Sequence, residues 1–244
     1  TMLTLFIKEI NTFFSSLIGY MAMVVFLLTT GLFLWVFPET NLLDYGYASL
    51  DSLFFTAPWI FMFLVPAITM RSFSEEFKTG TIELLTTRPV TDLQIIAGKY
   101  LSAVFLVFFA LLPTLVYYFT IYRLGLPPGN LDSGAIWGSY IGLLLLGAAF
   151  AAIGIFASSL SSNQIVAFLL AVFLCFIFYQ TFDYLSKLNI FYARIDDVVE
   201  QLGINAHYES LSRGVIDTRD LVYFGSFIAL FLLLTQLVVE SRKW

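Results

Sequence analysis

Charged residues are scarce in this sequence. Only 12% of its 244 residues are Asp, Glu, Lys or Arg, whereas 59% are hydrophobic and the mean hydropathy is +0.89. A soluble domain usually carries about 25% charged and about 45–50% apolar residues. The composition therefore excludes an ordinary soluble fold and requires lipid around much of the protein surface. The formal net charge of -5 gives no support for nucleic acid as a partner.

Cysteine and histidine are nearly absent as well. Cys175 stands alone in an apolar run, so it cannot form an internal disulfide and is expected to serve in packing. His207 has no second histidine or cysteine beside it, which argues against a metal site. The phosphate-binding motif G-x-x-x-x-G-K-[S/T] is missing too. We therefore expect no catalytic, cofactor-binding or metal-binding residue in this chain, and no ATP hydrolysis by that route.

Long apolar runs dominate what is present. About 20 apolar residues in a helix span the hydrocarbon core of a bilayer, and only helices satisfy every backbone group within one segment. Close helix packing is expected for the fourth run because it is rich in glycine and alanine. The sequence predicts a single all-α transmembrane domain over residues 1–244. Its six spans are expected at Leu17–Phe37, Ser52–Met70, Ile95–Tyr122, Ile136–Ser158, Ile165–Leu185 and Leu221–Val239.

The distribution of lysine and arginine predicts which ends face the cytoplasm. The loop between the first two spans has no basic residue, whereas the loop between the second and third spans carries Arg71, Lys78 and Arg88, with Lys99 close behind. Basic residues concentrate on the cytoplasmic side of membrane proteins. We therefore expect both termini in the cytoplasm.

Two segments on that inner side show helical signals. Residues 2–16 place apolar side chains at helical spacing, which predicts a helix in the membrane interface that bends near Gly19 into the first span. In the cytoplasmic loop, residues 71–91, Ser72 and Glu75 fit a capping box, and Gly80 is a stop signal. A second short helix is expected over 81–87, followed by a capping box of Thr91 and Gln94 that opens the third span.

The loop before the last span, residues 187–220, is too long for a simple turn. Its apolar residues recur at helical spacing on both sides of Gly203. This pattern predicts two short amphipathic helices on the outer membrane face. Their expected docking face consists of Ile195, Val199, Leu202, Tyr208 and Leu211.

The cytoplasmic loop resembles the corresponding loop of ABC-2 type permeases. That family shows an arginine, a Glu-Glu pair, Gly-Thr-[Ile/Leu]-Glu-Leu-Leu, Thr-x-Pro and Gly-Lys. The positions that carry the resemblance here are Arg71, Glu75, Glu76, Gly80, Thr81, Ile82, Glu83, Leu84, Leu85, Thr87, Pro89, Val90, Thr91, Gly98 and Lys99. Within that family, residues 5–20 look most like the gliding-motility-associated permeases of Bacteroidetes.

The resemblance implies a transport subunit in a bacterial inner membrane. The helix after the second span would seat on a separate ABC ATPase subunit, which holds the ATP and Mg²⁺ and closes when ATP binds. A second permease chain or copy would complete the pathway. A gliding-type membrane subunit with a periplasmic domain is a further partner that the resemblance implies. The residues assigned to the ATPase-coupling interface are Arg71, Phe73, Glu75, Glu76, Phe77, Gly80, Thr81, Glu83, Leu84, Leu85 and Pro89.

Simpler interpretations stand beside these assignments. The loop 71–89 also fits a solvated connector, and Glu75 and Glu76 also fit pairs with Arg71 and Lys78 within one helix. Near absence of charge within the spans disfavours an ion-coupled carrier. Near absence of polar residues across the spans also leaves room for a second hypothesis, a non-transporting membrane scaffold that anchors a motility or secretion complex.

Overall fold

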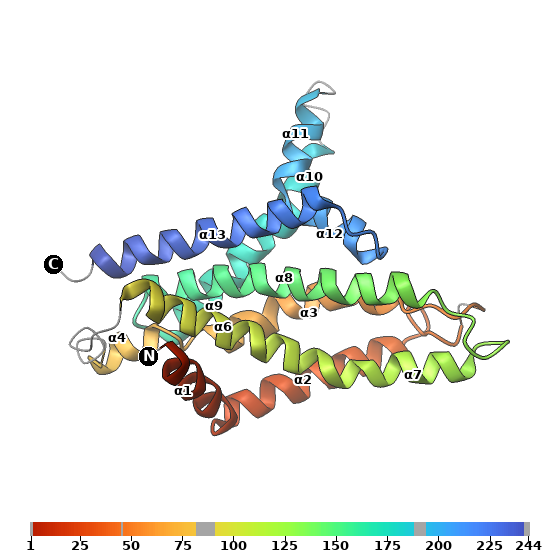
Figure 1. The fold of residues 1–244 in the computed structure, drawn as a ribbon, viewed down its shortest axis with the longest axis horizontal. Coiled ribbons are helices and arrows are strands. Elements are labelled where there is room, and N and C mark those ends of the chain that lie inside the picture. The colour runs from red at the N-terminus through yellow and green to blue at the C-terminus, as the bar shows by residue number, and fades with distance from the viewer. Residues whose placement is uncertain (1, 45, 82–90, 188–193, 242–244) are drawn as a thin grey trace.

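The computed structural model describes residues 2–44, 46–81, 91–187 and 194–241, which form helices joined by turns (Figure 1). In the described part of the chain, six helical segments are long and apolar enough to cross a membrane, as predicted. They are α2 (Leu17–Trp35), α3 (Asp51–Thr69), α6 to α7 (Asp92–Leu111 and Leu115–Leu124, joined by the 3-10 turn η1, Leu112–Thr114), α8 (Ser133–Leu160), α9 to α10 (Gln164–Phe176 and Phe182–Ser186, joined by the π-helix η2, Ile177–Thr181) and α13 (Thr218–Ser241).

Outside these spans, the described residues form four shorter helices. They are α1 (Met2–Phe14), α4 (Ser74–Thr79), α11 (Arg194–Leu202) and α12 (Ile204–Ser212). Leu5 of α1, Phe73 beside α4 and Val239 of α13 pack in one apolar cluster, so these elements meet at the same end of the bundle. We call it the α4 end. The opposite end, where α12 packs on α8, is called the α12 end.

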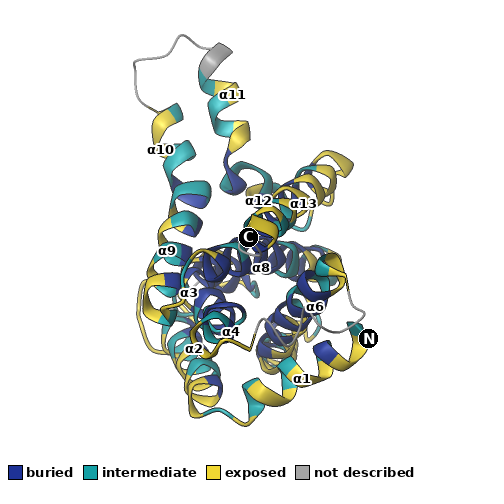
Figure 2. Ribbon diagram, turned by 90° about the vertical axis from the view of Figure 1, so that its left-hand side faces the viewer, coloured by how far each residue is buried: buried dark blue, intermediate teal, exposed yellow. Residues whose placement is uncertain are grey.

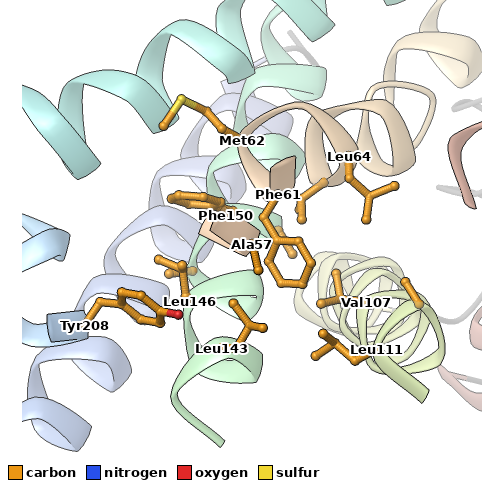
Figure 3. Packing of buried hydrophobic residues seen from close by; sticks show 14 of the residues in the cluster. Ala57, Phe61, Met62, Leu64, Val107, Leu111, Leu143, Leu146, Phe150 and Tyr208 are labelled. Atoms are coloured by element: carbon orange, nitrogen blue, oxygen red, sulfur yellow. The ribbon is translucent and has the colours of Figure 1, made fainter. Parts of the chain in front are cut away.

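The central helix of the bundle is α8, and most of its residues are buried (Figure 2). Its glycines allow close approach of neighbouring helices. A β-carbon on Gly142 would lie 2.6 Å from Leu211 Cβ, and one on Gly154 would collide with Thr69. The prediction of close packing in this span is therefore confirmed. The space around α8 is filled by large apolar side chains, as Figure 3 shows for Phe61, Val107, Leu146 and Phe150.

Proline and glycine shape the other helices in different ways. Pro113 lies in the 3-10 turn that separates α6 from α7, whereas α3 continues as one helix through Pro58 and Pro66. The bend between α1 and α2 falls at Ser15 and Ser16, a few residues before the predicted position at Gly19. Gly19 has another role, because a β-carbon there would collide with the backbone oxygen of Phe13.

Two helices stand away from the bundle. Figures 1 and 2 both show α10 and α11 side by side and projecting outward as an arm, beyond the point where η2 interrupts the fifth span. After the arm, α12 returns to pack on α8, and α13 runs back to the α4 end. The two short helices predicted around Gly203 are present as α11 and α12.

Candidate functional site

The turn and helix that follow α3 carry the motif singled out in the sequence. Helix α4 begins at Ser74 with Phe73 as its N-cap, and no side chain caps it. The capping box expected from Ser72 and Glu75 is therefore wrong. The carboxylate of Glu75 instead accepts two hydrogen bonds from the Arg71 guanidinium, at 2.9 and 3.2 Å. Gly80 ends the helix with φ +70°, a left-handed conformation that favours glycine, as predicted.

A lysine ammonium is buried directly beside α4. Lys99, in the first turns of α6, is only 1% exposed. Its Nζ donates to Glu9 Oε1 at 2.8 Å and to the backbone oxygen of Ser72 at 2.6 Å, and it forms an ion pair with Glu76 Oε1 at 2.9 Å. An ammonium has three protons to donate. Two hydrogen bonds and one further ion pair, with oxygens from three different segments, therefore stabilise the buried ammonium.

The charges around Lys99 balance. Lys8 Nζ lies 3.1 Å from Glu76 Oε1 and 3.9 Å from Glu9 Oε1, which gives two lysines and two glutamates. We call Lys8, Glu9, Glu76 and Lys99 the Lys99 cluster. The second carboxylate oxygen of Glu76 is buried and has no hydrogen-bond partner among the described residues. Glu76 therefore depends on the two lysines to offset the cost of burying its charge.

An aromatic layer underlies the Lys99 cluster. The Nζ of Lys99 lies 5.1 Å from the centroid of the Phe73 ring, a cation–π distance. Phe73 is fully buried and stacks on Phe77 with ring centroids 6.2 Å apart. Its backbone N–H donates to Ser158 Oγ of α8 at 3.2 Å. The start of α4 is thus fixed to the bundle by both apolar and polar contacts.

These contacts divide the predicted coupling residues into two groups. Phe73 and Glu76 are buried within the chain, so in this conformation they cannot touch a partner. The exposed surface is the tip formed by Lys78, Thr79, Gly80 and Thr81, with Arg71, Glu75 and Phe77 partly exposed beside it. Residues Glu83, Leu84, Leu85 and Pro89 lie outside the described part of the chain, as does most of the predicted helix over 81–87.

The predicted docking face at the other end is likewise divided. Tyr208 and Leu211 are buried, and the Tyr208 hydroxyl donates to the backbone oxygen of Phe54 at 2.8 Å. Burial raises the pKa of Tyr208 well above its usual value. These two residues therefore hold α12 on the bundle and offer no surface. Leu202 is exposed and Val199 half-buried, while the Ile195 side chain lies outside the description.

His207 joins three helices near this face. Its Nδ1 lies 2.7 Å from Asp220 Oδ1 at the start of α13, and its Nε2 lies 3.0 Å from the Gln201 backbone oxygen in α11. The ring stacks on Tyr223 at 3.8 Å between centroids. Ser210 also hydrogen-bonds to Asp220. The histidine therefore acts as a structural link between α11, α12 and α13.

Sequence reasoning missed the functional grouping of Lys8, Glu9 and Lys99. Lys99 was noted as a basic residue on the inner side and as part of a Gly-Lys pair, and the glutamate that it contacts in α1 lies 90 positions earlier. The sequence offered one signal, since a lysine near the start of an apolar span must find acceptors if it faces the protein interior.

Six apolar spans, with a buried lysine ammonium and an exposed helix tip at one end, define a multi-pass membrane protein. A comparison with known families makes the class specific. Residues 38–195, well over half of the chain, match the sequence profile of the ABC-2 family transporter proteins. The chain belongs to this family, whose members are membrane subunits of ABC transporters and not the ATPase. No curated protein matches the sequence closely enough to count as a relative.

Proposed function

We propose that the chain is a permease subunit that couples ATP hydrolysis by a separate ABC ATPase to transport or extraction across the membrane. The observation that carries this proposal is the exposed tip at the end of α4, residues 78–81, which lies beside the buried Lys99 ammonium and its carboxylate partners. An exposed, charged tip with a rigid base suits a contact that must transmit force. The ATP and Mg²⁺ would be bound by the partner.

The same proposal places the α4 end in the cytoplasm of a bacterial inner membrane. Lys8, Arg71, Lys78 and Lys99 all lie at or near this end, and basic residues favour the cytoplasmic side. A second permease chain or copy would complete the pathway. The likeness of residues 5–20 to gliding-motility permeases supports a role in gliding, with a further membrane subunit that carries a periplasmic domain.

A scaffold function is the second candidate. The arm formed by α10 and α11 presents exposed apolar side chains, among them Tyr184, Val198 and Leu202. Such a surface suits an anchor for another membrane protein. This function predicts that the partner ATPase works at the same rate with or without this chain.

The two functions are separated by changing the tip of α4. The full-length chain is purified from its native membrane with the ATPase that accompanies it, and ATP hydrolysis is measured in nanodiscs. We expect Lys78→Glu and Thr81→Trp to weaken ATPase binding about tenfold or more, because they change charge and shape at an exposed interface. Phe77→Asp is less specific, since Phe77 also stacks on Phe73.

The matched control is Lys187→Glu, a charge reversal on a lysine that is exposed at the far end of the fifth span. It should leave ATPase binding and stimulation unchanged. If the tip variants bind and stimulate the ATPase as the unmodified chain does, the coupling proposal is wrong and the scaffold is favoured.

A further inference from the structure

We infer that Lys99 is a positioning residue that makes the N-terminal helix α1 part of the moving unit, so that a displacement of α4 passes into α1 and α6 together. This inference rests on the proposed function and adds a route to it. The observation that suggests it is the set of acceptors around one buried ammonium. They come from α1, from α4 and from the turn before α4, while Lys99 itself belongs to α6.

The strength of this link follows from its burial. Lys99 is 1% exposed, and the side chains of Glu76 and Glu9 are 9% and 18% exposed. Ion pairs in such surroundings are screened little by water or salt. Separating α4 from α6 would leave charges buried without partners, which costs far more than moving the helices together.

Helix α1 is bound to α6 along its length as well. Phe6 packs edge-on against Phe105 with centroids 5.8 Å apart, and Phe14 packs against Phe109 at 5.0 Å. A β-carbon on Gly98 would lie 3.4 Å from Leu5 Cβ. Because α1 packs closely on α6 and shares the Lys99 ammonium with α4, the three helices have few ways to move independently.

Helix α4 also has a covalent link to α3, a hydrogen bond to α8 and an ion pair with an exposed lysine of α1. The turn at Met70–Phe73 joins it covalently to α3, and the Phe73 N–H binds Ser158 of α8. Lys8 also reaches Glu76 from α1, but its side chain is 53% exposed and therefore hydrated. Lys99 is a buried cation that bridges α1, α4 and α6, so its removal should uncouple α4 from α1 and α6 without exposing or changing the tip of α4.

The first test removes the ammonium. In Lys99→Met we expect the ATPase to remain bound and its stimulation to fall at least fivefold.

A second variant covers the case in which Lys99→Met fails to fold. The triple variant Glu9→Gln, Glu76→Gln, Lys99→Met removes both signs of charge, so no buried charge is stranded. It should fold and bind the ATPase but show the same loss of stimulation, whereas Lys187→Met should show none. Normal stimulation in the folded triple variant would overturn the inference.

These outcomes are separate from failure of the proposed function. If the unmodified chain does not stimulate the ATPase, the coupling function itself is wrong, and the inference falls with it. If the unmodified chain stimulates and the triple variant does so equally, the coupling function stands and only the role of Lys99 is lost.

Discussion

Ion pairs occur at both ends of the molecule, but they differ in burial. At the α4 end, Lys99 is 1% exposed and its two carboxylate partners are largely enclosed. At the α12 end, Arg213 and Glu209 pair at 2.7 Å with side chains 69% and 61% exposed. The His207–Asp220 contact lies between these extremes, at 16% and 10% exposure. The distances are alike, so burial and not proximity decides how strongly each pair constrains its helices.

The largest effect is expected at the buried extreme. Lys99→Met leaves Glu9 and Glu76 with only the half-exposed Lys8 beside them, and breaking a buried ion pair typically costs about 3–5 kcal/mol. The measurement is the free energy of unfolding of the purified chain in detergent micelles. Lys187→Met, which removes an exposed lysine at the other end, should have a much smaller effect. Equal effects of the two substitutions would contradict the comparison.

An intermediate effect is expected at Asp220. The substitution Asp220→Asn replaces a carboxylate that binds both His207 and Ser210 with an amide that can accept only through one oxygen. Leaving one of these partners unsatisfied should cost about 1–3 kcal/mol in the same unfolding assay. Asp217→Asn is the control, because Asp217 lies on an exposed turn close by. A loss as large as that of Lys99→Met would show that the two ends are equivalent.

The smallest effect is expected for the exposed pair. Arg213→Ala removes an i,i+4 contact with Glu209, and such pairs contribute about 0.3–0.5 kcal/mol. The change should shrink further when salt is added, because exposed charges are screened. Unfolding of Arg213→Ala at low and high salt measures this. A salt-independent loss above about 1 kcal/mol would mean that this pair is more enclosed than its exposure indicates.

Sequence patterns were sufficient for the spans because length and apolarity are local properties. The capping box of Thr91 and Gln94 is confirmed for the same reason, since both partners lie within one turn. The similar pattern at Ser72 and Glu75 was misleading, because Arg71 binds the Glu75 side chain and the helix starts later. A local pattern predicts a cap only when nothing else competes for its side chains.

The Lys99 cluster was beyond prediction because its members are far apart in sequence. Lys8 and Glu76 are 68 positions apart, and no periodicity connects them. The bend at Ser16, between α1 and α2, lets α1 pack on α6. The contact between these residues depends on that packing, which is a property of the whole bundle. The same holds for Tyr208 and Leu211, whose apolar character was detected but whose burial against the bundle was not.

The π-helix η2 determines where the arm points. A turn closed by i→i+5 hydrogen bonds contains one residue more than an α-helical turn, and each α-helical residue corresponds to about 100° of rotation. The orientation of α10 is therefore encoded in the number of residues between Phe176 and Phe182 more than in their identity. Deleting a single residue there would rotate the arm about the helix axis by roughly a quarter to a third of a turn. Most substitutions would leave its direction unchanged.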